Sequence, residues 1–177
     1  MLTKLDNQAF QSMDDDALIA ACAQSAFETV RSADMSDGEV RADRLEWLTP
    51  PQRDLLFYRI YELHATKSAD DFRWWTSYFL PRDNLWSGIK RALASFGGGS
   101  VLNALEAVER ASREPSDPES GQEDDSPSTF IYTDSRLAAP FAEAFRTFQQ
   151  QVPELRRRIA TRIRNHPGEF IEFADKP

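Results

Sequence analysis

The chain has 177 residues, of which 41% are hydrophobic and 28% are charged, and its formal net charge is −8. This length suits a single domain with a proper core, and this composition is ordinary for a globular protein. The negative charge argues against non-specific binding of nucleic acid or of anionic lipid, because like charges repel. It is compatible with a basic partner.

The cysteine content and the N-terminal residues indicate in which cellular compartment the protein is expected. Cys22 is the only cysteine, so an intrachain disulfide is excluded and a reducing compartment fits best. The first residues carry no apolar signal core, and no later run is long enough to span a bilayer. We therefore expect a cytoplasmic protein in which Cys22 is a small buried hydrophobe rather than a reactive thiol.

The N-terminal third predicts three helices after an irregular lead-in at residues 1–13. Residues 14–16, three aspartates, open the first of them, because carboxylates favour the positive end of the helix dipole. A shorter helix is predicted at about residues 39–47. Thr49 followed by two prolines then marks the start of a helix that reaches about His64.

Residues 71–80 are unusually aromatic and predict a central core helix. Phe72, Trp75 and Phe79 recur at helical spacing. Aromatic side chains bury more apolar area than other types, so a helix rich in them must lie against other elements. We expect the helices before and after it to pack around it.

Two further helices are predicted in the middle of the chain, at residues 85–96 and 101–111. The glycines at 97–99 separate them and are interpreted as a helix stop and hinge. A phosphate-binding loop is disfavoured because its Lys-Ser/Thr pair and its flanking strand are both missing. Ser100 is the predicted cap of the second helix.

Residues 113–129 differ sharply from their surroundings, since they contain prolines, serines, a glycine and six acidic residues. We predict a mobile acidic surface loop there, inside one domain, with a short extended piece at 129–132. The remaining chain predicts two helices, one at 140–151 and one that starts at Pro153.

Together these elements predict an all-α, single-domain bundle of about seven helices over residues 1–177, with almost no strand. The two histidines, His64 and His166, each end a helix and are interpreted as capping residues. No zinc-protease, paired-cysteine or nucleophile-elbow motif is present, and the spacing supports no metal site. We therefore expect a non-enzymatic protein without a cofactor; a hydrolase with an unrecognised site is a weaker alternative.

The charges are unevenly distributed along the chain. Residues 1–46 carry ten acidic and four basic side chains, whereas the last helix carries five arginines. Acids held on helices can stand in for DNA phosphates, or they can form an ordinary solvated face. The arginines either hold an acidic partner or pair with the protein's own acids. The candidate partner-binding residues are Asp14, Asp15, Asp16, Glu39, Asp43, Glu46, Asp70 and Asp71.

The end of the last helix, from Leu155 to Phe170, contains Ile163-Arg164-Asn165-His166-Pro167-Gly168-Glu169-Phe170. It resembles the closing signature "Tyr-Ile-Arg-x-His-Pro-Glu-x-Phe" of a bacterial DNA-mimic protein family, otherwise grouped as a domain of unknown function. The segments 61–63, 71–79, 104–108 and 141–148 are similar to other parts of that family, and the resemblance covers about residues 48–170. One departure is Ala69-Asp70-Asp71-Phe72, where the family usually has Asn-Gly-Gly-Phe.

The resemblance implies an all-helical, cytoplasmic homodimer whose carboxylates occupy the DNA-binding face of a transcription regulator or a similar protein. We therefore predict an acidic binding protein that mimics DNA, blocks a basic partner, and itself binds neither nucleic acid nor membrane. The alternative is an immunity protein that neutralises a toxin enzyme by occlusion. A toxin gene next to this one, or a one-to-one complex with the toxin, would distinguish the two.

Overall fold

The computed structural model describes residues 2–31, 42–114 and 126–174, and over these ranges the protein is all-α, as predicted. The described α-helices are α1 (Asn7–Ser12), α2 (Asp15–Val30), α3 (Pro50–Ala65), α4 (Ala69–Phe79), α5 (Asp83–Ser95), α6 (Gly99–Arg113), α7 (Pro127–Thr133) and α8 (Ala138–Asn165). The described 3-10 helices are η1 (Ala42–Trp47), η2 (Ser135–Leu137) and η3 (Pro167–Glu169), and the described strands are β1 (Thr3–Leu5) and β2 (Ile171–Phe173).

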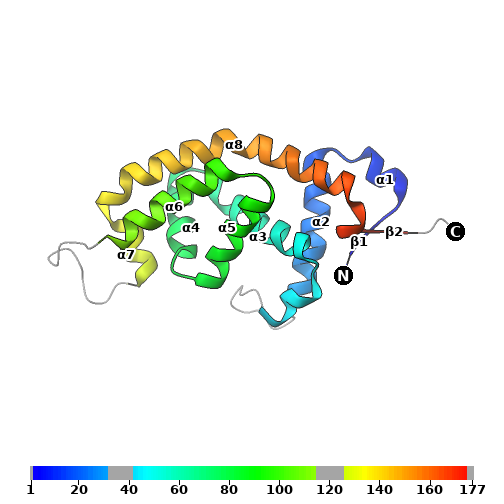
Figure 1. Cartoon of the computed structure of the whole chain (residues 1–177), viewed down its shortest axis with the longest axis horizontal. Helices are drawn as coiled ribbons and strands as arrows, with labels where there is room; N and C mark the ends of the chain where they lie inside the picture. The colour runs from blue at the N-terminus through cyan, green and yellow to red at the C-terminus, as the bar shows by residue number, and fades with distance from the viewer. Residues whose placement is uncertain (1, 32–41, 115–125, 175–177) are drawn as a thin grey trace.

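Helix α8 runs along the long axis of the molecule; most of the other helices lie beneath it in this view, and α1 lies beside the strands at one end (Figure 1). Helices α4 and α6 contact α8, and α2 contacts it toward its C-terminal end (Figure 1). The predicted break at Pro153 is wrong, because α8 is a single helix of 28 residues with Pro153 inside it. Val152 and Leu155 on either side are buried, so core packing keeps this segment helical although proline donates no backbone hydrogen bond.

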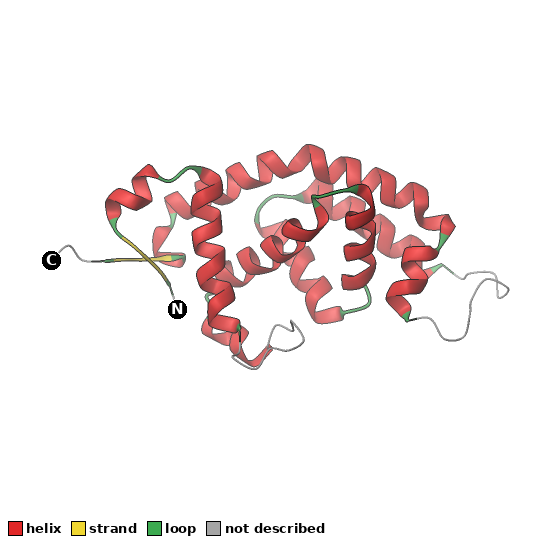
Figure 2. Ribbon diagram, turned by 180° about the vertical axis from the view of Figure 1, so that it is seen from behind, coloured by secondary structure: helices red, strands yellow, loops and turns green. Residues whose placement is uncertain are grey.

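The core around α4 is aromatic, as predicted. Phe72 is fully buried, with its ring centroid 6.2 Å from that of Tyr61 and 5.6 Å from that of Phe148. The Tyr61 hydroxyl lies 2.7 Å from Thr76 Oγ1, so the buried phenol keeps a hydrogen bond. Trp74 lies on the outer side of the same helix and is 43% exposed. Helix α4 packs against α3, α7 and α8. Figure 2 shows the same arrangement of helices from behind.

The start of α3 follows its sequence signal, and α4 also begins at a capped turn. Thr49 Oγ1 accepts a hydrogen bond from the Gln52 amide at 3.3 Å, and Gln52 Oε1 accepts one from the Thr49 amide at 3.0 Å, which completes a capping box. At α4 the N-cap is Ser68, whose Oγ accepts from the Asp71 amide at 3.0 Å and donates to Asp71 Oδ2 at 2.6 Å. Asp71 therefore supports the first turn of α4 through this serine.

Three predicted boundaries around the middle of the chain are wrong. Residues 129–132 are not extended but belong to α7, which begins after the Ser126 cap. The predicted loop at 113–129 therefore overlaps helices at both ends, and 115–125 lie outside the described residues. Helix α6 begins at Gly99 after a Gly98 cap, so Ser100 is inside the helix. The glycine helix stop is confirmed, because Gly97 has a φ of 74°, a left-handed conformation that favours glycine.

The lead-in at residues 1–13 contains structure that the sequence pattern did not predict. Strand β1 pairs in parallel with β2, with Thr3 opposite Ile171, so segments near the two ends of the chain lie side by side (Figure 1). The rings of Phe10 in α1 and Phe173 in β2 meet edge to face at 5.3 Å. Strands of three residues are too short to display the alternating pattern by which strands are recognised.

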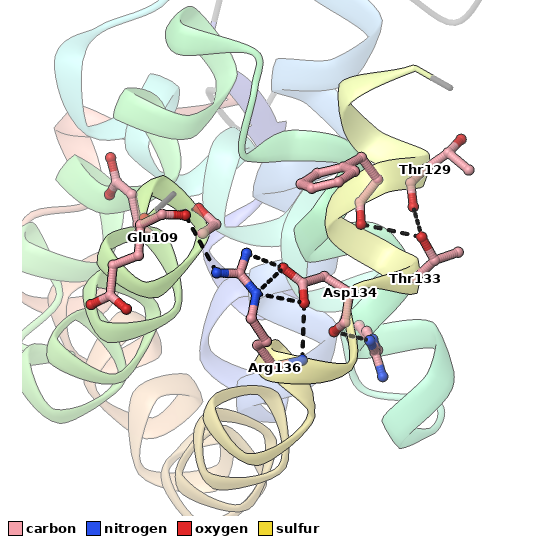
Figure 3. A network of polar contacts seen from close by, with 9 residues as sticks. Glu109, Thr129, Thr133, Asp134 and Arg136 are labelled. Atoms are coloured by element: carbon pink, nitrogen blue, oxygen red, sulfur yellow. Dashed lines mark hydrogen bonds and ion pairs between the residues drawn. The ribbon is translucent and has the colours of Figure 1, made fainter. Parts of the chain in front are cut away.

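A polar network joins α7 to the start of α8 (Figure 3). Arg136 Nη2 donates to Asp134 Oδ2 at 2.6 Å, and the Asp134 carbonyl accepts from Arg73 Nη2 of α4 at 2.9 Å. The hydrogen bond from Arg136 lowers the pKa of Asp134. Thr133 Oγ1 donates to the Thr129 carbonyl at 3.0 Å within α7. The contact between Arg73 and Asp134 holds the end of α7 onto α4, which is a structural role.

Glu109 is a buried carboxylate between α5 and α6. It accepts hydrogen bonds from Trp86 Nε1 and Lys90 Nζ, both at 2.8 Å, and from Arg113 Nη2 at 2.5 Å. Burial alone raises the pKa of Glu109, but the hydrogen bonds from Lys90 and Trp86 and the nearby positive charges outweigh it and lower the pKa below its usual value. The ionised carboxylate is therefore the form that the fold stabilises.

We expect the stabilisation by ionised Glu109 to be present at neutral pH and to be lost as the pH falls through the folded-state pKa. A carboxyl whose pKa is lower in the folded state binds protons preferentially in the unfolded state, so acid favours unfolding. Urea unfolding of the chain and of Glu109→Gln, near neutral pH and at about pH 3, measures this. The difference in unfolding free energy should shrink at the lower pH; an unchanged difference contradicts the assignment.

Candidate functional site

The predicted acids at the start of α2 are held in fixed positions. Asp14 is the N-cap, and its Oδ1 accepts a hydrogen bond from the Ala17 amide at 2.7 Å. Asp15 forms an ion pair with Arg164, and Asp16 forms one with Arg156 at 3.4 Å. These pairs tie α2 to the C-terminal half of α8. They also reduce the negative charge that Asp15 and Asp16 present to a partner.

The other predicted acids lie on two separate elements. Asp70 and Asp71 are in the first turn of α4, where Asp70 is exposed and Asp71 is half-buried. Glu46 is exposed in η1. Asp43 is in η1 as well, but its side chain lies outside what the structure describes, and Glu39 lies wholly outside the described residues.

Residues 14–16 are adjacent at the start of α2, whereas Glu46 lies in η1 and Asp70 in the first turn of α4. Helix α2 has 16 residues, which is about 24 Å at 1.5 Å per residue, and η1 packs near its C-terminal end (Figure 1). One DNA strand carries about seven phosphates over that length. With its cap, α2 carries three exposed acids, Asp14, Asp16 and Glu28, which is fewer than seven.

The arginines of the last helix pair with the protein's own acids, which is one of the two interpretations offered above. Glu154 accepts hydrogen bonds from Arg157 and Arg158, which lower its pKa to about 2. Among the described residues the pairs are Arg156–Glu62, Arg156–Asp16, Arg157–Glu154, Arg158–Glu154, Arg162–Glu169 and Arg164–Asp15. Every arginine of this segment is thus already bound to a carboxylate.

Glu62 is a fully buried charge that the sequence analysis missed. Its carboxylate accepts from the Tyr58 hydroxyl at 3.1 Å, from Arg59 Nη1 at 2.6 Å and from Arg156 Nε at 2.6 Å. Arg156 also forms an ion pair with Asp16. A continuous series of ion pairs therefore links α3 to α8 and α8 to α2. The spacing of Arg59 and Glu62, three residues apart on a helix, was the available sequence signal, but it does not reveal burial.

An apolar hollow of about 300 Å³ lies between α2 and α3. Its lining residues are Ala20, Ala23, Gln24, Phe27, Leu56, Arg59, Ile60, Leu63 and His64. Leu63 is 48% exposed at this hollow. We call this feature the α2–α3 hollow.

His64 lines the α2–α3 hollow. The contacts of its ring differ from the capping role that we predicted for it. The ring stacks on Trp75 with a centroid distance of 3.8 Å, and its buried Nδ1 has no hydrogen-bond partner within the described residues. Burial lowers the pKa of His64, the charge of Lys67 lowers it further, and the charge of Asp71 opposes them. The imidazole is therefore neutral at neutral pH.

A second, open hollow of about 520 Å³ lies beside η3 and is mainly basic. It is lined by Arg157, Arg158, Thr161, Arg162, Asn165, His166 and Glu169. Within the described ranges, no group of three or more His, Cys, Asp and Glu side chains is placed to hold a metal ion. None of the described helices combines the length and the apolar composition that crossing a bilayer requires.

Cys22 is buried in α2, as predicted. Burial raises the pKa of its thiol to about 11, so little thiolate forms at neutral pH. We expect the folded chain to resist iodoacetamide near neutral pH, while the urea-unfolded chain reacts readily. Mass spectrometry of alkylated samples measures this, and rapid complete labelling of the folded chain would contradict the burial of Cys22.

A comparison of the chain with protein families, with curated proteins and with solved structures found no match. The resemblance of residues 48–170 to the DNA-mimic family thus depends on the motifs quoted above and stays a prediction. The structure itself defines an all-α protein with carboxylates on helix starts, an apolar α2–α3 hollow and an internally paired basic segment.

Proposed function

We propose that this chain is a non-enzymatic binding protein that mimics DNA and blocks a basic, nucleic-acid-binding partner such as a transcription regulator. The observation that carries the proposal is the fixed placement of exposed carboxylates on helix starts. Asp14 is held by its bond to Ala17, and Asp70 lies in the capped first turn of α4. Mimicry of a phosphate backbone needs charges at constant positions, which a helix start supplies and a flexible segment does not.

The contact acids of this proposal are Asp14, Glu46 and Asp70, which are exposed and form no ion pair with other described residues. Asp16 is a fourth contributor, because 68% of its side chain is exposed although Arg156 lies 3.4 Å away. Asp15 is bound more closely by Arg164 and contributes less. The family resemblance implies a cytoplasmic homodimer, and we include this in the same proposal.

A charge-neutral variant of the contact acids tests the proposal. Asp14→Asn, Glu46→Gln and Asp70→Asn together remove three negative charges, and asparagine at position 14 still caps α2. The tagged chain is used to capture partners from the native cell at about 0.05 M and about 0.3 M salt. We expect the wild-type chain to retain a basic DNA-binding protein at the lower salt and to lose most of it at the higher salt.

The matched control removes three exposed acids elsewhere, through Asp83→Asn, Glu143→Gln and Glu172→Gln. The contact-acid variant should retain about tenfold less partner than the control at low salt, since about 1.4 kcal/mol of attraction corresponds to tenfold in affinity. Equal losses in the two variants would mean that only net charge matters. Retention that is indifferent to salt would also contradict the proposal.

Occlusion of a toxin enzyme is the second candidate, and the α2–α3 hollow favours it. Enzyme inhibitors commonly anchor through a few apolar side chains at the centre of the interface, whereas imitation of phosphates needs none. A one-to-one complex with an enzyme that has no DNA-binding site would support this function over mimicry. A toxin gene beside the gene for this chain would point the same way.

A further inference from the structure

The open basic hollow of about 520 Å³ beside η3 has no role in the proposed function. We call it the η3 hollow. Most of its lining belongs to the last turns of α8 or directly follows them: Arg157, Arg158, Thr161, Arg162, Asn165 and His166. These residues form two rows with a spacing of four positions, so they share one face of the helix. Glu169 of η3 is the one acid among the described lining residues.

Both sides of the η3 hollow are held in place. The Glu169 carbonyl accepts a hydrogen bond from Thr49 Oγ1 at 2.9 Å, which fixes η3 against the start of α3. On the α8 side, Arg158 Nη1 donates to the Gly97 carbonyl at 2.6 Å. A ligand therefore meets groups that are already oriented, which reduces the entropy lost on binding.

Ion pairing occupies only part of each arginine in the η3 hollow, because a guanidinium has five N–H groups. Arg157 uses Nε and Nη2 for Glu154, and Arg158 uses Nε for the same carboxylate. Arg162 uses only Nη2, for Glu169 at 3.3 Å, and its buried Nε has no partner within the described residues. Nη1 of Arg157, Nη2 of Arg158 and Nη1 of Arg162 are likewise unpartnered there.

The charges around the η3 hollow leave a positive excess. Its three guanidiniums are balanced by two carboxylates, because Glu154 pairs with both Arg157 and Arg158. Asp15 also acts on Arg157, but it is itself paired with Arg164. The carbonyls at the end of α8 disfavour an anion, so the arginine side chains have to hold it.

We propose that the η3 hollow binds a phosphate group, either free or carried by a small molecule. A phosphate directs its oxygens several ways and suits donors from several side chains, here Arg157, Arg158 and Arg162, whereas a planar carboxylate matches a single guanidinium fork. The proposal does not depend on the proposed function, since none of these residues is a contact acid.

A nucleic acid fits the η3 hollow less well than a single phosphate group. The described lining contains no phenylalanine, tyrosine or tryptophan on which a nucleobase could stack. The net charge of −8 also repels a long polyanion, whereas a small anion meets mainly the local excess of arginine.

Isothermal titration calorimetry of the full chain with inorganic phosphate, glycerol phosphate and acetate, at constant ionic strength, tests the η3 hollow. We expect at least one of the phosphate compounds to bind about tenfold more tightly than acetate. Tighter binding of glycerol phosphate identifies a phosphate ester as the ligand, and tighter binding of inorganic phosphate identifies the free ion. Acetate that binds as tightly as both would overturn the proposal.

Arg162→Lys separates recognition by the guanidinium from attraction by charge. Lysine keeps a positive charge beside Glu169 but lacks Nε and the planar fork. We expect phosphate binding to weaken by about tenfold. The matched control is Arg110→Lys, which changes an exposed arginine of α6 and should leave the affinity unchanged. Circular dichroism confirms that each variant is folded.

Arg157→Gln is a second test with little effect on the fold, because its side chain is 65% exposed and Glu154 keeps its pair with Arg158. It should also weaken phosphate binding by about tenfold, whereas Arg110→Gln removes the same charge elsewhere and should not. Equal losses in these two variants, or unchanged binding in both variants of the hollow, would overturn the proposal. A single-stranded oligonucleotide that binds through these arginines more tightly than phosphate would overturn it as well.

Discussion

Replacing Phe72 with alanine lowers the free energy of unfolding by about 3–5 kcal/mol, the usual cost of deleting a fully buried ring. Phe72 meets the rings of Tyr61, Phe145 and Phe148 at centroid distances of 6.2, 5.4 and 5.6 Å, so α3, α4 and α8 all lose contacts at once. Urea unfolding followed by circular dichroism measures the change.

Trp74→Ala in the same helix is the control for Phe72→Ala. Trp74 is 43% exposed, and its ring meets that of Tyr132 edge to face at 5.3 Å. Losing one such pair on a half-exposed helix face costs about 1 kcal/mol. Similar losses in the two variants would contradict the placement of Phe72 at the centre of the aromatic core.

Glu62→Gln is expected to cost about 2–4 kcal/mol of unfolding free energy, because it removes one partner of a buried charge network. The side chain keeps its volume, but Arg59 and Arg156 then face each other without the carboxylate that lies 2.6 Å from both. Loss of these pairs also releases α8 from α3. The measurement is again urea unfolding near neutral pH.

Glu143→Gln gives the matched comparison for Glu62→Gln. It also breaks an arginine–glutamate pair three residues apart on a helix, with Arg146, but both side chains are more than half exposed. An exposed pair of this kind is worth at most about 1 kcal/mol. If Glu62→Gln is no more costly than Glu143→Gln, the network around Glu62 does not stabilise the fold.

Local signals in the sequence were enough to predict most helices. Thr49 and the two prolines after it mark the start of α3 because a cap and a proline need only their immediate neighbours. The buried positions Phe72 and Phe79 follow from helical spacing alone. Pro153 misled the prediction, since its neighbours Val152 and Leu155 are held by the core, and a core contact is not a local signal.

The candidate site was harder to predict because its electrostatics depend on residues far apart in the chain. Asp15 and Arg164 are 149 positions apart, and Asp16 and Arg156 are 140 positions apart. The sequence indicated that acids gather at one end of the chain and arginines at the other, but not that they meet. The α2–α3 hollow was equally invisible, because Leu63 has the helical spacing of a core residue and is nevertheless exposed.

The most direct test of the central claim is a competition for the captured partner between this chain and duplex DNA. A labelled duplex is bound to the partner, and the chain is added while fluorescence anisotropy reports whether the duplex is released. Mimicry predicts stoichiometric release of the duplex by the wild-type chain and about tenfold weaker release by the contact-acid variant. A ternary complex in which the duplex stays bound would contradict the account.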